Sequence, residues 1–383
     1  MPKLTFYPIG NADCCLIDLA NGKKVLFDYA DKRDPTCKDD RRCDLPKELR
    51  ADLATVGRDY YDVVAFTHLD NDHYKGATSF FGLEHDSNYQ SADRVKISVM
   101  WVPAAAITED PKTLKDDEAR LIQKEAQHRF KKGEGIRVFS RPQRLKAWCE
   151  KNGVSFKGRE HLVTDAGWCA PELTLSADGV EFFVHSPFAK RLDATNLEDR
   201  NADSIVMQAK FVVGQIETKV LLMADTVQDR LSDIVEITRY HNREVRLEWD
   251  IAKLPHHCSY LSLAHPGEKG KDKTKPLENI RWLYETQRQP GGIIVSTSWP
   301  IPVKGSLEDE CTDPPHRQAA NYYKEDVVDC PDAEFLVTMQ RPNETSPKPL
   351  IIDIDENKAT ERKRALTASA IATSRQAPRA GGY

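Results

Sequence analysis

Short apolar runs alternate with polar turns from the first residues of the chain onward. Apolar positions recur through 4–9, 14–19 and 25–27, and Asn21-Gly22 between the last two runs is typical of a tight hairpin. The pattern therefore predicts a β-rich opening of short strands joined by hairpins, and not strand–helix–strand units.

Apolar runs of strand length continue through the rest of the chain. They predict strands at 62–66, 95–102, 173–175, 180–185, 204–213, 219–223, 249–254 and 293–296, and a closing hairpin from 334–339 and 350–354. Helices are expected near 46–56 and 228–240. Strands interspersed with helices in this way indicate a mixed α/β fold.

Two segments depart from this pattern. Residues 105–153 are highly charged and helix-like, and we expect them to be an insertion at the rim of the fold. The basic residues between Lys112 and Arg144 fit either a solvated helix face or a basic lid over a phosphate-rich substrate. After residue 356 the composition shifts to Ala, Ser, Thr, Lys and Arg, which predicts a disordered tail at 356–383 and one folded domain at 1–355.

Composition narrows the class of protein. Apolar residues make up 40% of the 383 residues, enough for a sizeable core, and a net charge of −5 does not indicate a strongly basic nucleic-acid binder. No apolar stretch approaches the ~18 residues of a membrane span, and the first residues lack the apolar core of a signal peptide. The nine cysteines include no Cys-x-x-Cys pair. We therefore expect a cytoplasmic protein with reduced thiols and no contact with a membrane.

The strongest chemical signal follows the predicted strand at 62–66. Four side chains able to bind a metal lie within six residues: His68, Asp70, Asp72 and His73. Imidazole nitrogen and carboxylate oxygen both suit zinc, and a loop at the end of a strand can turn these side chains toward one or two ions. The alternative, a polar surface turn, is the weaker interpretation for a segment of this composition.

Two other predicted strands end in residues of the same kind. Residues 220–224 lead to Asp225, and 251–255 lead to His256 and His257. Strand ends at one edge of a sheet are where open α/β architectures bind ligands. Taken alone, Asp225 fits a helix N-cap better than a ligand, and the histidine pair is ambiguous, so the inference depends on the three segments together.

These three segments together resemble those of the metallo-β-lactamase superfamily, and the resemblance extends over about residues 3–355. The usual motif is His-x-His-x-Asp-His, and here Asp70 stands in place of the second His. This variant is similar to the ComEC-type competence and DNA-uptake hydrolases and their stand-alone relatives. Segments 9–14, 201–204 and 254–259 also resemble that branch, with Cys258 in place of a glycine.

The resemblance implies an αβ/βα sandwich, with two mixed β-sheets face to face, helices outside and a metal site at one edge. It implies that His68 and Asp70 hold a first ion, that Asp72 and His73 hold a second, and that Asp225 bridges both. His257 would be the last ligand, with His256 orienting a ligand or the substrate. Two Zn²⁺ per chain are expected, and Mn²⁺ is an alternative because the site has three carboxylates.

Two departures from the family pattern bear on this expectation. The ligand His that other branches carry before the bridging Asp has no counterpart: Asn201 stands near that place and His185 lies upstream. A weakly held first ion, or a single ion, is therefore an alternative. Cys258 fits either a thiolate ligand or, better, a small buried residue. Asn201, Ser204 and Ser259 fit either hydrogen bonds to substrate oxygens or ordinary capping.

These residues and the resemblance together predict a metal-dependent hydrolase. Divalent ions lower the pKa of bound water to about 7, which makes hydroxide available, and Asp72 and Asp225 would be the catalytic carboxylates. The branch implies a phosphodiester substrate, either nucleic acid or a nucleotide. The alternatives are a carbon-ester, lactone or thioester hydrolase of the same fold, and a non-catalytic regulatory member of a defence-type complex.

Overall fold

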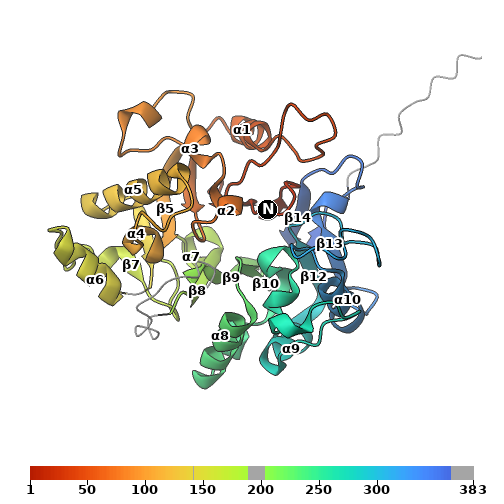
Figure 1. Ribbon diagram of the computed structural model, residues 1–383. Helices are drawn as coiled ribbons and strands as arrows, with labels where there is room; N and C mark the ends of the chain where they lie inside the picture. The colour runs from red at the N-terminus through yellow and green to blue at the C-terminus, as the bar shows by residue number, and fades with distance from the viewer. Residues whose placement is uncertain (141, 189–202, 364–383) are drawn as a thin grey trace, which may run out of the picture.

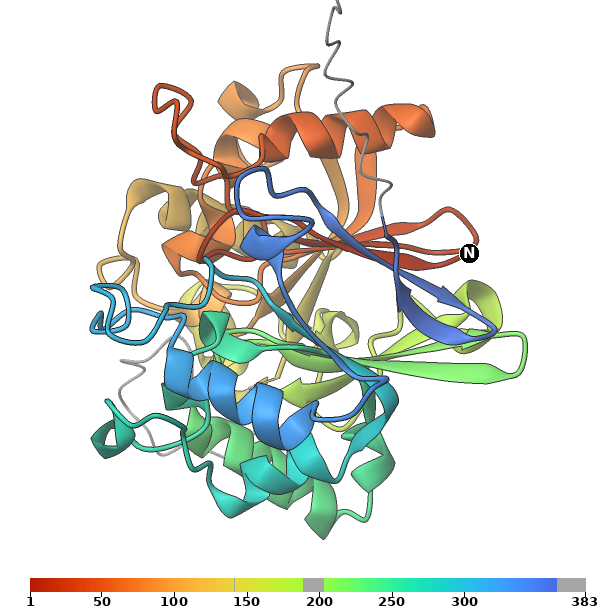
Figure 2. The same ribbon diagram turned by 90° about the vertical axis from the view of Figure 1, so that its right-hand side faces the viewer.

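Two mixed β-sheets pack face to face in the computed structural model, which describes residues 1–140, 142–188 and 203–363. Helices cover the outer face of each sheet, so the layers run helix, sheet, sheet, helix (Figure 1, Figure 2). The inner faces of the sheets meet in a buried apolar core that includes Phe27, Trp101 and Phe182. This is the expected αβ/βα sandwich. None of the helices in the described ranges has the length and apolar character needed to cross a membrane.

The first sheet has nine strands in the order β15-β14-β1-β2-β3-β4-β5-β6-β7. Strands β1, β2 and β3 pair antiparallel as the sequence predicted, whereas β3 to β7 run parallel. Its strands are β1 (Lys3–Phe6), β2 (Cys15–Asp18), β3 (Lys24–Phe27), β4 (Tyr60–Ala65), β5 (Lys96–Pro103), β6 (Ile136–Phe139), β7 (Val163–Thr164), β14 (Leu350–Asp355) and β15 (Lys358–Glu361). The α-helices of this half of the chain are α1 (Leu45–Thr55), α2 (Asn71–Tyr74), α3 (Ala77–Phe80), α4 (Ala105–Thr108), α5 (Asp117–Lys132) and α6 (Pro142–Lys151).

The second sheet has six strands in the order β13-β12-β11-β10-β9-β8. The four strands β10 to β13 run parallel, and β8 and β9 add an antiparallel edge. Its strands are β8 (Val180–Ser186), β9 (Val206–Val213), β10 (Ile216–Met223), β11 (Trp249–Lys253), β12 (Arg288–Ser296) and β13 (Glu334–Val337). The α-helices of this half are α7 (Leu175–Asp178), α8 (Gln228–Tyr240), α9 (Glu278–Glu285) and α10 (Arg317–Tyr322).

Helix α1 shows how the local sequence sets an element. Asp44 accepts a hydrogen bond from the N–H of Lys47 and caps the helix, and the proline in the first turn needs no hydrogen-bond donor. The buried residues Leu45, Leu49 and Leu53 recur at a spacing of four, which places them on one face of the helix against the sheet.

Two predictions of local structure were wrong. The closing hairpin does not form, because β13 pairs with β12 in the second sheet and β14 pairs with β1 in the first. Residues 173–175 do not form a strand either, since the Thr174 hydroxyl accepts from the N–H of Ala177 and caps α7. An apolar run specifies that a strand forms but not its partner, and a threonine suits strand and cap equally.

Residues 105–153 are less of an insertion than expected. Strand β6 lies within the first sheet, and α5 buries one face against the fold. Arg129 and Arg137 are buried and paired with Glu125 and Glu172, so these basic residues stabilise the domain.

The domain also extends past residue 356, because Lys358–Glu361 forms β15 and pairs with β14. The start of the expected tail was therefore placed too early, and residues 364–383 lie outside the described part of the chain. Trp101 and Trp249 are buried in the core, whereas Trp168 is 70% exposed.

Candidate metal centre

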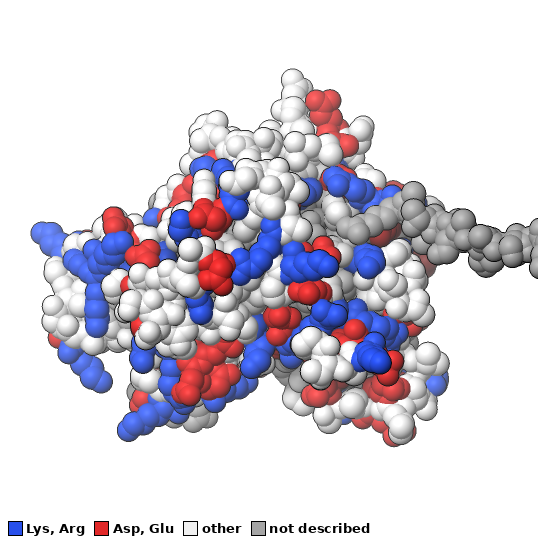
Figure 3. Space-filling model, turned by 90° about the horizontal axis from the view of Figure 1, so that it is seen from above, with Lys and Arg blue, Asp and Glu red and all other residues white. Residues whose placement is uncertain are grey.

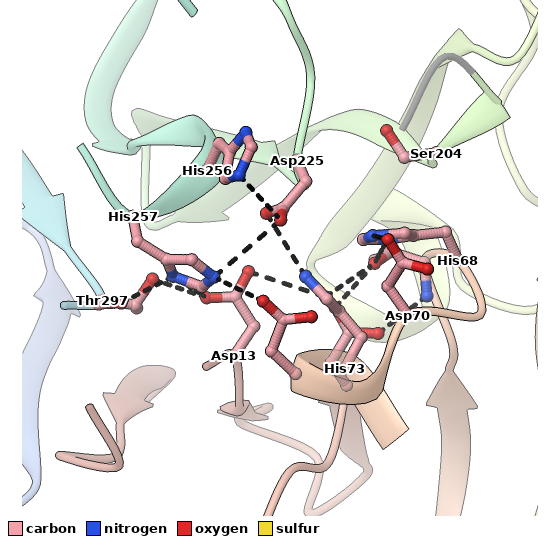
Figure 4. A network of polar contacts seen from close by, with 12 residues as sticks. Asp13, His68, Asp70, His73, Ser204, Asp225, His256, His257 and Thr297 are labelled. Carbon is pink, nitrogen blue, oxygen red and sulfur yellow. Dashed lines mark hydrogen bonds and ion pairs between the residues drawn. The ribbon is translucent and has the colours of Figure 1, made fainter. Parts of the chain in front are cut away.

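Parallel strands from both sheets deliver the candidate residues to one edge of the sandwich. Strand β4 leads into the segment that carries His68 to His73, β10 leads to Asp225, and β11 leads to His256 and His257. The close-up in Figure 4 shows these side chains converging from the two sheets. Because the carboxyl ends of parallel strands share an edge, segments more than 150 residues apart in sequence meet there.

Four of these residues form a compact cluster: Asp72, His73, Asp225 and His257 each offer a ligand atom, and all four atoms lie within 4.8 Å of one another. The His73 Nε2 atom is 3.3 Å from Asp225 Oδ1, and His257 Nε2 is 3.3 Å from Asp72 Oδ2. Two imidazole nitrogens and two carboxylates are a donor set that suits a divalent transition-metal ion.

The Nδ1 atoms of both histidines are held by the surrounding protein. His73 Nδ1 donates to Asp28 Oδ2 at 2.8 Å. His257 Nδ1 donates to the Thr297 carbonyl at 2.8 Å (Figure 4). Since these acceptors carry no proton, Nδ1 must carry it in each ring, and Nε2 is the atom that faces the cluster. Such anchoring is the usual environment of a metal-binding histidine.

Two atoms at the centre of the cluster test whether a cation fits. His73 Nε2 and Asp225 Oδ1 are buried 3.3 Å apart, and neither has another hydrogen-bond partner among the described residues. Leaving buried polar atoms unsatisfied costs about 1–3 kcal/mol each. A divalent ion would satisfy both, so the residues present fit a metal.

The electrostatics of the cluster keep its carboxylates ionised. Burial opposes this, but His73 and His257 lower the pKa of Asp225 well below its usual value. The Asp72 pKa is likewise lowered against burial, by the hydrogen bond from His257 and by the charge of His73. Conversely, Asp225 and Asp28 raise the pKa of His73 well above its usual value despite complete burial. The cluster is a concentration of negative charge that attracts protons, and a cation can replace those protons.

His68 and Asp70 lie beside this cluster and not within it. Thr67 Oγ1 donates to Asp28 and therefore accepts from His68 Nδ1 at 3.2 Å, which leaves His68 Nε2 buried and without a hydrogen bond to any described residue. That Nε2 atom is 4.0 Å from Asp70 Oδ2. Asp70 Oδ1 in turn lies 3.1 Å from the Lys115 ammonium. No group of three candidate ligands in the described ranges includes His68 or Asp70.

His256 and its neighbours have an unusual backbone. His256, His257 and Cys258 have φ values of 48°, 52° and 67°, so three consecutive non-glycine residues are left-handed. This conformation costs roughly 1–2 kcal/mol per residue. It turns the two imidazoles apart, so that His257 enters the cluster while His256 Nε2 stays 3.9 Å from Asp225 Oδ2, with a quarter of its side chain exposed (25%).

Cys258 is a buried core residue. Its side chain packs among the apolar residues under the second sheet, and burial raises the pKa of the thiol to about 12. The thiol is therefore protonated at neutral pH. The left-handed backbone gives a physical reason for a glycine in related segments, because glycine adopts this conformation without steric cost.

The remaining candidate residues from the sequence are not members of the four-residue cluster. Ser259 is buried, and its hydroxyl accepts from the N–H of Leu261 as a cap. The Ser204 hydroxyl is buried 3.4 Å from Thr226 Oγ1. Asn201 lies outside the described residues. His185 contacts the Arg246 carbonyl at 2.8 Å and does not belong to the ligand cluster.

The sequence analysis missed the residues that support the cluster. Asp13 pairs with buried Lys253, accepts from Thr297 Oγ1 at 2.5 Å, and donates through its own N–H to the Asp72 carbonyl at 3.0 Å. Asp28 follows β3 as the candidate ligands follow their strands, and Lys253 is a lysine within an apolar strand. The position of Asp28 after a strand and the presence of a lysine within an apolar strand were the features of the sequence that could have indicated these residues.

Comparisons with known proteins add little to this geometry. No protein-family model matches the sequence, and no curated protein matches it. A solved structure described as a new diphosphatase from the PhnP family is 11% identical, with 93% of this chain and 98% of that one covered and a TM-score of 0.33. A subclass B3 metallo-β-lactamase of Bradyrhizobium japonicum is 14% identical, with 73% and 89% covered and a TM-score of 0.27. Likeness at this level says nothing about activity or ligand, and the sandwich described above rests on the chain's own strand order.

Proposed function

We propose that this protein is a metal-dependent hydrolase of the metallo-β-lactamase type that cleaves a phosphodiester. The observation that carries the proposal is the cluster of Asp72, His73, Asp225 and His257, with both Nδ1 atoms anchored and both Nε2 atoms turned inward. His73 Nε2 and Asp225 Oδ1 face each other at its centre without another hydrogen-bond partner among the described residues, and a shared cation would satisfy both.

These four side chains would hold a divalent ion. When bound, such an ion polarises the substrate and lowers the pKa of bound water to about 7. The imidazoles favour zinc, and the carboxylates make manganese the alternative. Asp28 and the Thr297 carbonyl keep the two rings oriented, so their orientation does not have to be established at each turnover.

Asp72 and His256 are the members of the site that reach solvent, with side chains 26% and 25% exposed. Asp72 can orient a water molecule for attack. His256 can donate a proton to the leaving oxygen, because it stands next to Asp225 at the open side of the cluster.

The phosphodiester substrate is supported by the sequence resemblance to the ComEC-type branch. The basic residues of helix α5 do not add to that support. Arg120 pairs with Asp117, Arg129 with Glu125, and Lys132 with Glu84. The face seen in Figure 3 carries acidic and basic side chains interspersed, without an extended basic track. Within the proposed phosphodiester class, the substrate is a nucleic acid or a nucleotide.

The test combines metal analysis with a two-substrate panel. Protein purified without chelators is assayed for bound metal and for hydrolysis of bis(4-nitrophenyl) phosphate and of a lactone. Asp72→Ala and His73→Ala should abolish phosphodiester hydrolysis, and His241→Ala, at an exposed histidine, should not change it. Circular dichroism confirms that each variant is folded, and Asp72→Ala serves if loss of buried His73 prevents folding.

The outcomes separate the alternatives. Turnover that survives both site substitutions would contradict the assigned site. Lactone hydrolysis without phosphodiester hydrolysis would overturn the substrate class and leave the metal centre standing. Protein that takes up no Zn²⁺ or Mn²⁺ even after soaking would contradict the metal centre and favour the non-catalytic alternative.

A further inference from the structure

The Lys115 side chain, which is 56% exposed, forms an ion pair with Asp70, one of the two residues that the resemblance assigns to the first of two ions. Its ammonium is 3.1 Å from Asp70 Oδ1, and Asp70 is largely buried, with 15% of its side chain exposed. His68 and Asp70 are the two ligands expected to hold that ion, and they lack a third His, Cys, Asp or Glu within ligand distance among the described residues. The first ion position therefore fits a metal poorly, whereas the four-residue cluster, which contains the residues assigned to the second ion, fits one well.

Asp116, the residue after Lys115, holds this part of the chain against the segment that contains Asp70. Asp116 accepts from Tyr74 Oη at 2.9 Å and from Asn71 Nδ2 at 3.3 Å, and it also caps α5 through the N–H of Ala119. One residue thus joins the start of α5 to α2, the short helix that carries Asp72 and His73. The backbone next to Lys115 is therefore fixed on the segment that contains Asp70.

Charge balance agrees with this placement. The carboxylates of Asp70, Asp72 and Asp225 contribute three negative charges at this edge of the sheets. Asp13 is compensated separately by Lys253, and Asp28 is satisfied by His73 and Thr67. One divalent ion at the cluster and the ammonium of Lys115 neutralise the three carboxylates.

We propose that the Lys115 ammonium takes the place of the first of the two cations, so that the protein works with a single divalent ion held by Asp72, His73, Asp225 and His257. The inference rests on the proposed metal centre and departs from the two ions expected from the family. In this arrangement His68 and Asp70 form one side of the site, and Lys115 supplies there a fixed positive charge toward an anionic substrate.

The number of bound ions tests the proposal directly. Metal-free wild type, Lys115→Met and Lys112→Met are titrated with Mn²⁺, and stoichiometry is measured by equilibrium dialysis and by electron paramagnetic resonance. Lys112 is an exposed lysine of the same loop and is the matched control. We expect one ion in the wild type and in Lys112→Met, and two in Lys115→Met with the signal of a magnetically coupled pair. Adding His68→Ala to Lys115→Met should return the count to one.

Each other result is decisive. Two ions in the wild type would overturn the role of Lys115 and leave the proposed hydrolase intact. One ion in Lys115→Met, with folding verified by circular dichroism, would show that the lysine does not exclude a metal, which also overturns the inference. No ion in any of the proteins would instead overturn the metal centre itself, so the two failures are distinguishable.

Discussion

The Asp28 carboxylate is hydrogen-bonded to His73 Nδ1 at 2.8 Å, and both side chains are buried. The same carboxylate accepts from the N–H and the hydroxyl of Thr67, and that hydroxyl contacts His68 Nδ1. One residue at the end of β3 therefore orients two histidines that follow β4.

Asp28→Asn should weaken metal binding without removing any ligand. The amide cannot accept as strongly from His73 Nδ1, so the ring becomes less basic and less well oriented. We expect metal affinity to fall by about 10–100-fold, the range typical for loss of such an outer partner. Isothermal titration with Zn²⁺ or Mn²⁺ measures it.

The matched control is Asp250→Asn. Asp250 is also buried, but it accepts from the Lys219 N–H and pairs with Lys358, away from the ligand cluster. Affinity should not change in that variant even if its stability does. Equal losses in the two variants would mean that general destabilisation, and not the contact with His73, weakens binding.

The stability of the fold should decline in mild acid because of His185. Burial lowers the pKa of this histidine to about 4, below the usual 6.5. The unfolded chain then binds a proton between those values that the native state excludes, so stability is full above about pH 6.5 and is lost as the pH falls toward 4. The expected loss at pH 5 is on the order of 1–2 kcal/mol.

Urea unfolding at pH 7 and pH 5 measures this loss. His185→Gln removes the titrating group and should make the difference between the two pH values smaller. His241→Gln, at an exposed histidine, should leave that difference as in the wild type. A pH dependence that is unchanged in His185→Gln would contradict the assignment to His185.

Gly10→Ala should destabilise the protein for two reasons that a control separates. Gly10 has φ +78°, and a Cβ there would lie 2.9 Å from Trp299 Cε2. Gly57 also has a positive φ, +65°, but a Cβ there would meet nothing within 4 Å. We expect about 1 kcal/mol for Gly57→Ala from backbone strain alone, and about 1–3 kcal/mol more for Gly10→Ala from the clash.

The midpoint of urea unfolding measures both costs. The backbone N–H of Trp299 donates to Asn11 Oδ1, so a shift of Trp299 would also disturb the loop that leads to Asp13. Metal affinity should therefore fall in Gly10→Ala and not in Gly57→Ala. Equal destabilisation by the two substitutions would mean that the indole moves aside at no cost.

Much of the local structure could be predicted from the chain alone. The period of apolar residues was sufficient for α8, at 228–240, and for the antiparallel opening of β1 to β3. It could not assign β13 and β14 to different sheets, since β13 pairs with β12, 41 residues earlier, and β14 pairs with β1 at the other end of the domain. Thr174 and residues 136–139 were misassigned because a cap and a strand in a charged region leave weak local signals.

The candidate site, like the fold, could be predicted from the sequence only in part. The candidate metal ligands could be recognised in the sequence, because His68, Asp70, Asp72 and His73 follow one another closely where an apolar run ends. Their supporting partners were not visible: Asp28 and Thr297 are ordinary residues until a fold places them beside a histidine. The contact between Lys115 and Asp70 likewise joins a loop before α5 to the segment after β4.

The sequence by itself determined which side chains can bind a metal and that strands deliver them, because these depend on residue type and on a short period. Only the tertiary structure decided which of them share one centre. Asp72, His73, Asp225 and His257 meet because two sheets bring the carboxyl ends of separate parallel strands to the same edge, while Asp70 faces Lys115. Ligand distances depend on packing between distant segments, and no local pattern in the chain encodes that packing.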